Sequence, residues 1–264
     1  MSKSNYTIII PSRLHSTRLA QKALLEIGGK PLVIQVVLQA QKTNARIVVA
    51  TDHQDIANVC KSYNIEYCMT SSEHQSGTDR LAECVEKLGL NCDEIVVNVQ
   101  GDEPFMSPQI IDDTAQALVK NPEYRMSTSA HLIKHAHEVI NPNVVKVVFN
   151  AKNKALYFSR APIPWNRDAW QDYSLNTAQN NAQEALGNMW RHIGVYGFRV
   201  GFLKKYPTLP PAQIEKSEML EQLRALYNGF DIYVCPTDIV PEAGIDTPED
   251  YARAVNKWQE IYNP

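Results

Sequence analysis

The chain has 264 residues, of which 44% are hydrophobic and 21% charged, and its formal net charge is -3 at pH 7. These values are typical of one large globular domain, or of one domain with a sizeable subdomain. The slight negative charge and the absence of a basic run argue against nucleic-acid binding. No apolar run approaches the ~20 residues of a membrane span, so no membrane association is expected.

Targeting and metal-binding signals are also weak. The first residues, Met1-Ser2-Lys3-Ser4-Asn5, lead into a strand without the apolar core of a secretory signal, so we expect a cytoplasmic protein. The five cysteines are odd in number and form no C-x-x-C pair, which favours reduced thiols. His131, His135 and His137 lack a further ligand at metal-site spacing, which favours a surface or helix-start role over a metal site.

Apolar runs alternate with amphipathic stretches through the first half of the chain. Their periodicity predicts strands at 8–10, 46–50, 65–69 and 94–99, and helices at 31–41, 55–62 and 79–88. This succession predicts an α/β fold with a mostly parallel central sheet and helices on both faces. Right-handed crossovers would bring the carboxyl ends of the strands to one edge.

The rhythm changes after Pro104. A helix is predicted at 108–120, followed by β-like runs at 126–132, 144–149 and 155–158, strands at 192–200 and 232–235, and helices at 215–227 and 248–261. The polar stretch 166–187 fits either a mobile insertion or a plain surface loop. No linker separates two domains, so we expect a single domain over 1–264 with a smaller mixed β region at roughly 126–212.

The loop after the first strand carries three cations among hydroxyl residues. The strand is expected to break at Pro11, and Arg13, Arg18 and Lys22 follow. Several positive groups together with hydroxyl and backbone donors suit a triphosphate. A solvated basic loop is the alternative, but the first βα unit is where α/β folds bind ligands.

A second motif is Ser76-Gly77-Thr78-Asp79-Arg80, whose small residues would let the backbone approach a planar ligand. Many turns have a similar composition, so this signal is weak. In a third motif, Gly101 and Asp102 follow the predicted buried strand at 94–99. A carboxylate there suits Mg²⁺, while the alternative is a turn that ends the strand.

A fourth motif precedes the last predicted helix. Asp246 is either the N-cap of that helix, with Glu249 completing a box-like pattern, or a second metal carboxylate. Thr247 is the competing cap. Taken alone, the motif favours the capping role.

Several strings then resemble, in order, the 3-deoxy-manno-octulosonate (Kdo) cytidylyltransferase family, the CMP-Kdo synthetases of Gram-negative bacteria. They are IPSRLHSTRLAQKALLEIGGKPL, ATD, SGTDR, VNVQGDEP, NPNVVKVVF, ALYFSRAPIPW, RHIGVYGFR, LEQLRAL and IDTPED. They extend from residue 10 to residue 250, which is nearly the whole chain. The combination of QGDEP with YFSRAPIPW and HIGVYGFR is highly specific.

The resemblance implies a Rossmann-like nucleotidyltransferase fold, usually dimeric, that needs Mg²⁺ and transfers CMP from CTP to Kdo. The products would be CMP-Kdo and pyrophosphate, for lipopolysaccharide synthesis. The smaller β region would then serve sugar binding and dimerisation.

Motif matches also imply site residues. Those implied for the triphosphate and for catalysis are Arg13 and Lys22, assisted by Ser12 and Arg18. Those implied for the cytosine and ribose are Ser76, Gly77, Thr78 and Arg80, and those for Mg²⁺ are Asp102, which would also contact CTP, and Asp246. Those implied for the sugar are Gln100, Arg160, His192, Tyr196, Glu221 and Gln222.

Other interpretations of the sugar residues stay open. Arg160 is equally well explained as a structural arginine. His192 and Tyr196 lie four apart in a predicted strand and share a face, which fits a sugar pocket or simple sheet packing. Glu221 and Gln222 lie near the middle of the helix predicted at 215–227, where carboxylates usually mark a solvated face, and their assignment rests almost wholly on the resemblance.

The first loop departs from the family pattern. Where the family usually reads R-L-P-G-K-P-L, residues 18–24 read R-L-A-Q-K-A-L. The loss of two prolines and a glycine should alter loop rigidity and rate rather than the reaction, because the cations remain. Alternative functions are cytidylyl transfer to an 8-amino Kdo analogue or to sialic acid, and a non-catalytic nucleotide-binding module.

Overall fold

The computed structural model describes residues 4–16, 18–74, 76–167, 186 and 189–262. Its contacts divide the chain into two compact units. The first comprises Met1–Gln116, Val195–Pro207 and Pro241–Pro264, and the second comprises Ala117–Gly194 and Thr208–Val240. Strand β10 (Trp190–Arg199) contributes its first half to the second unit and its second half to the first.

A mostly parallel sheet forms the first unit. Its strands are β1 (Tyr6–Ser12), β4 (Arg46–Thr51), β5 (Tyr67–Met69), β6 (Ile95–Asn98) and the end of β10. Strand β1 pairs in parallel with β4 and β6, β4 pairs in parallel with β5, and β6 pairs antiparallel with β10. The buried isoleucines Ile8, Ile9 and Ile10 account for the central position of β1.

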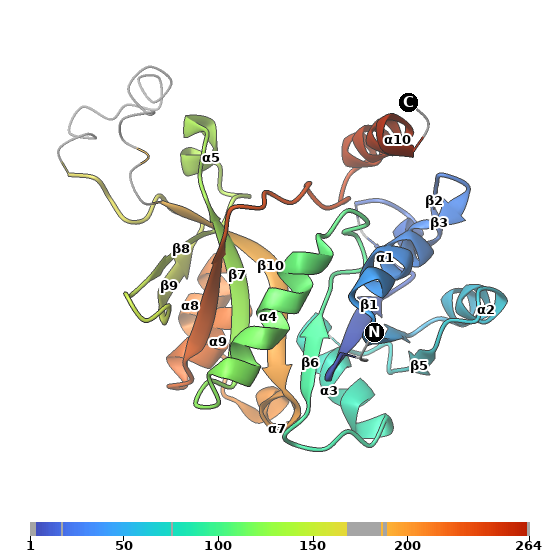
Figure 1. The fold of residues 1–264 in the computed structure, drawn as a ribbon, viewed down its shortest axis with the longest axis horizontal. Helices are drawn as coiled ribbons and strands as arrows, with labels where there is room; N and C mark the ends of the chain where they lie inside the picture. The colour runs from blue at the N-terminus through green and yellow to red at the C-terminus, as the bar shows by residue number, and fades with distance from the viewer. Residues whose placement is uncertain (1–3, 17, 75, 168–185, 187–188, 263–264) are drawn as a thin grey trace. The chain divides into compact units, whose positions relative to one another are not determined.

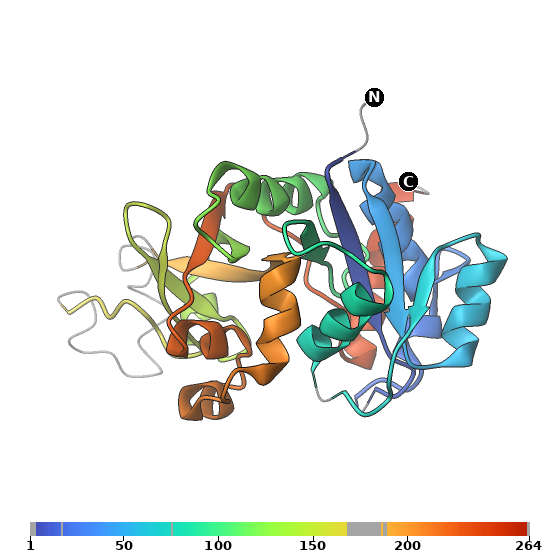
Figure 2. The ribbon, with the colours of Figure 1, turned by 90° about the horizontal axis from the view of Figure 1, so that it is seen from below.

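Helices cover both faces of this sheet. Figures 1 and 2 show α1 (Leu32–Ala40) and the start of α4 (Pro108–Lys120) on one face, and α3 (Gly77–Lys87) and α7 (Val200–Lys205) on the other. The other elements of this unit are α2 (Gln54–Ser62), α10 (Pro248–Tyr262), the short helices η1 (Lys22–Leu24) and η2 (Gln41–Thr43), and the hairpin β2 (Glu26–Ile27) and β3 (Lys30–Pro31). The predicted α/β fold is confirmed.

Pro11 does not end β1 as predicted. The strand continues to Ser12, paired with β4. Ile9 accepts a hydrogen bond from the N–H of Val99 on the side of β6, and Pro11, two residues later, faces the same side. The pairing of β1 with β6 ends at Ile9, so the missing N–H of Pro11 interrupts no ladder.

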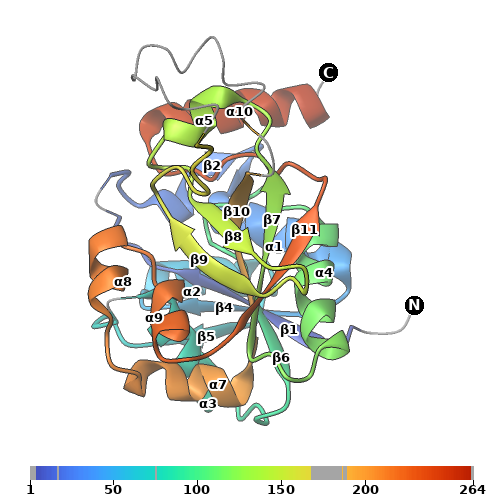
Figure 3. The same cartoon turned by 90° about the vertical axis from the view of Figure 1, so that its left-hand side faces the viewer.

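The second unit has a mixed β sheet, whose strands are labelled in Figure 3, and it covers 117–194 and 208–240 rather than the expected 126–212. Strands β7 (Met126–Leu132) and β11 (Ile232–Thr237) pair in parallel, β8 (Lys146–Phe149) and β9 (Ala155–Ser159) form an antiparallel pair, and β8 also pairs with the start of β10. Its helices are α5 (Ala136–Ile140), α8 (Gln213–Glu218) and α9 (Gln222–Tyr227). The short helix η3 (Tyr206–Thr208) extends from one unit into the other.

The helix predicted at 215–227 is wrong, because α8 and α9 are separate. Met219 ends α8 with a left-handed backbone, at φ 50°. The residue is 77% exposed. Met219 is apolar and lies at a helical spacing from the apolar residues that follow it, so the sequence pattern predicts one continuous helix. Hydrophobic periodicity carries no information on the left-handed backbone at this residue.

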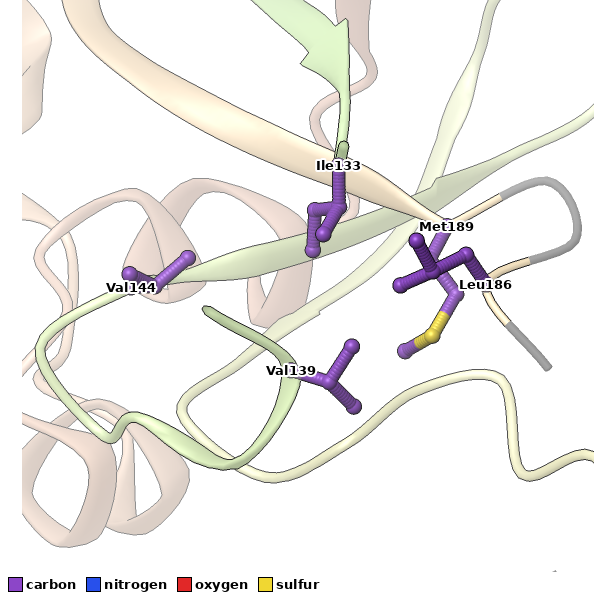
Figure 4. Close-up of a cluster of buried hydrophobic side chains, with 5 residues drawn as sticks. All are labelled: Ile133, Val139, Val144, Leu186 and Met189. Atoms are coloured by element: carbon purple, nitrogen blue, oxygen red, sulfur yellow. The ribbon is translucent and has the colours of Figure 1, made fainter. Parts of the chain in front are cut away.

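The short helices α5 and α7 and the hairpin β2–β3 also escaped prediction. Helix α5 is held by an apolar cluster of Ile133, Val139, Val144, Leu186 and Met189 (Figure 4). The predicted insertion at 166–187 lies almost wholly outside the described residues.

The cysteine and membrane predictions can be compared with the structure directly. All five cysteines are free thiols, as expected, and all but Cys92 are buried. Among the residues that the structure describes, no helix is long and apolar enough to cross a bilayer.

Candidate active site

Lys22 stands at the centre of a cluster of charged groups in the first unit. Its ammonium donates to Asp102 Oδ2 at 2.6 Å and to Asp246 Oδ1 at 3.0 Å. The guanidinium of Arg18 pairs with the same Asp246 oxygen at 3.0 Å. Burial opposes the charge on Lys22, but the two carboxylates outweigh it and raise its pKa above the usual value. The predicted triphosphate lysine thus bridges the two predicted metal carboxylates.

Asp102 reaches this cluster because the backbone turns tightly after β6. A Cβ atom on Gly101 would stand 2.7 Å from the carbonyl oxygen of Pro11, so glycine alone fits there. The close approach places Asp102 beside the end of β1. The carboxyl ends of neighbouring parallel strands therefore supply two sides of the site.

Asp246 is free to join the cluster because a neighbour caps the last helix. The hydroxyl of Thr247 accepts the backbone N–H of Asp250, and the Asp250 carboxylate accepts those of Asp246 and Thr247. This is a capping box with Thr247 as N-cap and Asp250, not Glu249, as its acidic partner. The N-cap role considered for Asp246 is therefore wrong.

The other predicted triphosphate residues lie around the end of β1. The Ser12 hydroxyl is buried and has no hydrogen-bond partner among the described residues. Arg13 is exposed and makes no ion pair with a described residue. The Ser12 hydroxyl and the Arg13 guanidinium are therefore both available to donate hydrogen bonds to an anion.

The two carboxylates also fit a divalent cation. Asp102 and Asp246 converge on one point, which a single cationic atom of Lys22 now fills. Mg²⁺ in nucleotide sites is commonly held by one or two carboxylates together with phosphate oxygens. Within the described ranges no three His, Cys, Asp or Glu side chains form a metal-binding group, so a metal here would complete its coordination with oxygens of water or of a bound molecule.

The Ser76–Arg80 motif forms the first turn of α3 rather than the loop before it. Ser76 is the N-cap and accepts the backbone N–H of Asp79 at 3.1 Å. Arg80 is 4% exposed, donating to Thr70 at 2.6 Å and pairing with Asp52 at 2.7 Å. Since Thr70 follows β5 and Asp52 follows β4, Arg80 fixes these strand ends. Asp52 lies in the ATD string but was not assigned a role.

Gln100 and Tyr196 lie near the end of β6. Tyr196 is paired in register with Asn98, which places both side chains on one face of the sheet. The Oδ1 atom of Asn98 is buried without a partner among the described residues. Sequence reasoning missed Asn98, although a polar residue in an otherwise apolar buried strand was a usable signal.

Arg160, in the second unit, is held by main-chain acceptors. Its guanidinium donates to the carbonyls of Glu218 at 2.7 Å, Pro142 at 2.8 Å and Met219 at 3.5 Å. The Glu218 carboxylate in turn accepts the Arg160 backbone N–H at 3.0 Å. These contacts give Arg160 a structural role and leave part of its donor fork available.

Lys146, which the sequence did not single out, completes this network. Its fully buried ammonium donates to the carbonyls of Asn141, Val144 and Arg160, at 3.1, 2.7 and 2.6 Å. Burial lowers its pKa to about 8, against the attraction of Glu218.

His192 is neutral in this environment. Its Nε2 lies 2.8 Å from the Thr128 hydroxyl, and its ring packs edge-on against Phe158. Burial lowers its pKa to about 3. His192 can therefore offer or accept a hydrogen bond at neutral pH but supplies no positive charge.

Glu221 and Gln222 begin α9, at its N-cap and first residue. Gln222 is 3% exposed, and its Nε2 has no partner among the described residues. A buried, unpaired amide donor is unusual on a solvated helix face and is consistent with a ligand contact.

The chain is similar to known proteins in sequence and in structure. A family model described as cytidylyltransferase matches residues 7–232. The solved structure of CMP:2-keto-3-deoxy-manno-octonic acid synthetase complexed with CTP is 33% identical, with a TM-score of 0.86, over 98% of this chain and all of the other.

Two distant structures share the fold only. One is a cytidylyltransferase from Leptospira borgpetersenii serovar Hardjo-bovis (strain JB197), 14% identical, with a TM-score of 0.62 over 98% of this chain and 88% of the other. The other is the inositol-1-phosphate CTP transferase from T. maritima, 14% identical, with a TM-score of 0.63 over 98% of each. The family match, together with the nucleotidyltransferase-like α/β fold, leads to one conclusion: this chain is a nucleotidyltransferase and belongs to the cytidylyltransferase family.

Proposed function

We propose that the protein transfers CMP from CTP to Kdo, giving CMP-Kdo and pyrophosphate. The observation that carries the proposal is the convergence of Asp102, Asp246 and Lys22 at the carboxyl edge of the first sheet. The 33% identity to a CMP-Kdo synthetase over the whole chain supports the choice of substrate.

The nucleotide side of the proposal uses the first loop. Arg13, Arg18 and Lys22 would neutralise the triphosphate, and the unpaired Ser12 hydroxyl would contribute a hydrogen bond. Ser76, Gly77 and Thr78 would border the cytosine and ribose from the first turn of α3. Arg80 would act by fixing that turn through Asp52 and Thr70.

Asp102 and Asp246 would hold Mg²⁺. Bound there, the cation would screen the phosphate charge and lower the pKa of a nearby hydroxyl. The other parts of the reaction depend on how the residues of the protein position the two substrates.

In the proposed reaction, the anomeric 2-hydroxyl oxygen of Kdo forms a bond to the α-phosphorus of CTP. The bond from that phosphorus to the α,β-bridging oxygen breaks, pyrophosphate leaves, and the hydroxyl proton passes to water. Arg13 and Lys22 would stabilise the charge that accumulates on the leaving pyrophosphate.

The sugar contacts remain predictions. Gln100, Tyr196, Glu221 and Gln222 would supply hydrogen bonds, as would His192 in its neutral form. The remaining donors of Arg160 would pair with the sugar carboxylate. We also propose that the protein is a homodimer, which light scattering after size-exclusion chromatography would test.

The decisive assay follows pyrophosphate release from CTP and Mg²⁺ with Kdo, its 8-amino analogue and sialic acid in parallel. Release with Kdo in clear preference is expected. Preference for the amino sugar would keep the reaction but replace the substrate. Tight CTP binding without release from any acceptor would indicate a nucleotide-binding module and contradict the proposal.

A further inference from the structure

We propose that Lys22 is a built-in substitute for the divalent cation, holding the metal carboxylates together until a nucleotide triphosphate draws it away. The inference rests on the proposed function, because it concerns the same two carboxylates. It adds a coupling between metal and nucleotide binding that depends on one side chain.

The geometry places Lys22, and not Arg18, at the shared point. Lys22 Nζ contacts both Asp102 and Asp246, whereas Arg18 contacts only Asp246. The Lys22 and Asp102 side chains are 17% and 25% exposed, whereas that of Arg18 is 63% exposed. Lys22 is therefore the inner cation and Arg18 the outer one.

A metal ion and this ammonium exclude each other. Mg²⁺ requires carboxylate oxygens at about 2.1 Å. Lys22 Nζ lies 2.6 Å from Asp102 Oδ2 and 3.0 Å from Asp246 Oδ1. A metal ion that takes these same two oxygens would lie close to the ammonium and repel it, so Lys22 must move before a metal can bridge the two aspartates there.

The alternative partner for the Lys22 ammonium is the phosphate of a bound nucleotide. Without nucleotide, moving Lys22 away from the carboxylates would break two charge-assisted hydrogen bonds. It would also leave a partly buried ammonium without an anionic partner. The triphosphate offers new anionic oxygens, and the flexible lysine stem allows the exchange. Metal alone should bind weakly, and nucleotide and metal should each increase the affinity for the other by the same factor.

The test measures Mn²⁺ binding by electron paramagnetic resonance, first without nucleotide. Lys22→Met should bind Mn²⁺ about tenfold or more tightly than the wild type, because no ammonium must be displaced. Lys30→Met is the matched control, since Lys30 makes no ion pair with a described residue, and it should leave the affinity unchanged. Asp102→Asn should abolish the binding.

Unchanged or weaker Mn²⁺ binding in Lys22→Met, with binding still lost in Asp102→Asn, would overturn the exchange while leaving the metal site intact. Mn²⁺ binding that is indifferent to Asp102→Asn would instead contradict the proposed metal site itself. The two failures are thus distinguishable.

Two further measurements keep the test independent of folding defects. Mn²⁺ should raise the melting temperature of Lys22→Met more than that of the wild type, because it replaces the missing cation. Addition of CTP should tighten Mn²⁺ binding to the wild type by a larger factor than to Lys22→Met. An equal factor in both proteins would overturn the proposal.

Discussion

Gly101 and Pro11 are in such close contact that any side chain on Gly101 would collide with the Pro11 carbonyl oxygen, 2.7 Å from the position of a Cβ atom. The contact joins the loop after β6 to the end of β1. It therefore fixes where Asp102 stands relative to the first loop.

Gly101→Ala should displace Asp102 and destabilise the protein by about 1–3 kcal/mol, as overpacking does. Denaturant unfolding would measure the loss, and nucleotide-dependent Mn²⁺ binding should weaken in parallel. Gly77→Ala is the control, because a Cβ atom there would have its nearest neighbour, Pro11 Cγ, at 3.9 Å. Equal stability of the two variants would show that the contact does not constrain the loop.

Gln21→Gly should stabilise the protein. Gln21 has φ 50° and occupies the position of the family's glycine in R-L-P-G-K-P-L. Its left-handed backbone costs about 1–2 kcal/mol for a residue with a Cβ atom, partly offset by the flexibility glycine adds to the unfolded chain. A rise in unfolding free energy of about 0.5–1 kcal/mol is expected. Ala20→Gly, which relieves no positive φ, should lower it; the reverse order would refute this explanation.

Thr247→Ala and Asp246→Asn should separate capping from chemistry. Loss of the Thr247 cap should destabilise α10 by about 1 kcal/mol, measured by thermal unfolding. Asp246→Asn leaves the capping box intact and should change stability less, while weakening metal binding. If Asp246→Asn proves the more destabilising and binds metal normally, the roles drawn from the hydrogen bonds are reversed.

His192 should make the ligand-free protein sensitive to mild acid. Its pKa is about 3 in the folded protein and near 6.5 when unfolded, so the unfolded chain takes up the proton first as pH falls. Its stabilising contribution is present above pH 6.5 and falls by about 1.4 kcal/mol for each unit well below it.

The measurement is the unfolding free energy at pH 7, 6 and 5 in the wild type and in His192→Gln, which retains a partner for Thr128. His131, whose pKa burial also lowers, stays in both proteins. As the pH falls, the unfolding free energy of the variant should decrease less steeply than that of the wild type. The difference in slope should approach the roughly 1.4 kcal/mol per pH unit that corresponds to one proton. Identical slopes would mean that His192 is not held neutral by the fold.

Most of the fold could be predicted from the sequence because its strands and helices have clear local patterns of apolar residues. The apolar run at 94–99 and the amphipathic helices at 31–41 and 79–88 have the right period and are buried as expected. The break at Met219 within 215–227 could not be predicted. Met219 has a left-handed backbone and is exposed, but as an apolar residue in sequence it looks like part of the buried face of one continuous helix.

The site was harder, since its decisive contacts join distant residues. Lys22 meets Asp102 and Asp246 across 80 and 224 positions of sequence. Motif position placed each one near a strand or helix end, but the bridge between them is tertiary. Likewise, the sequence offered Asp246 as the cap with Thr247 as its competitor, and only the hydrogen bonds of Asp250 decide for Thr247.

The central claim is most directly tested by pyrophosphate release from CTP, Mg²⁺ and Kdo, measured for the wild type and Asp102→Asn side by side. The variant should unfold at a similar temperature, because Lys22 keeps Asp246 as its partner. Its turnover should fall nearly to zero while the wild type is active. Undiminished turnover in the folded variant, or no turnover in the wild type, would contradict the account.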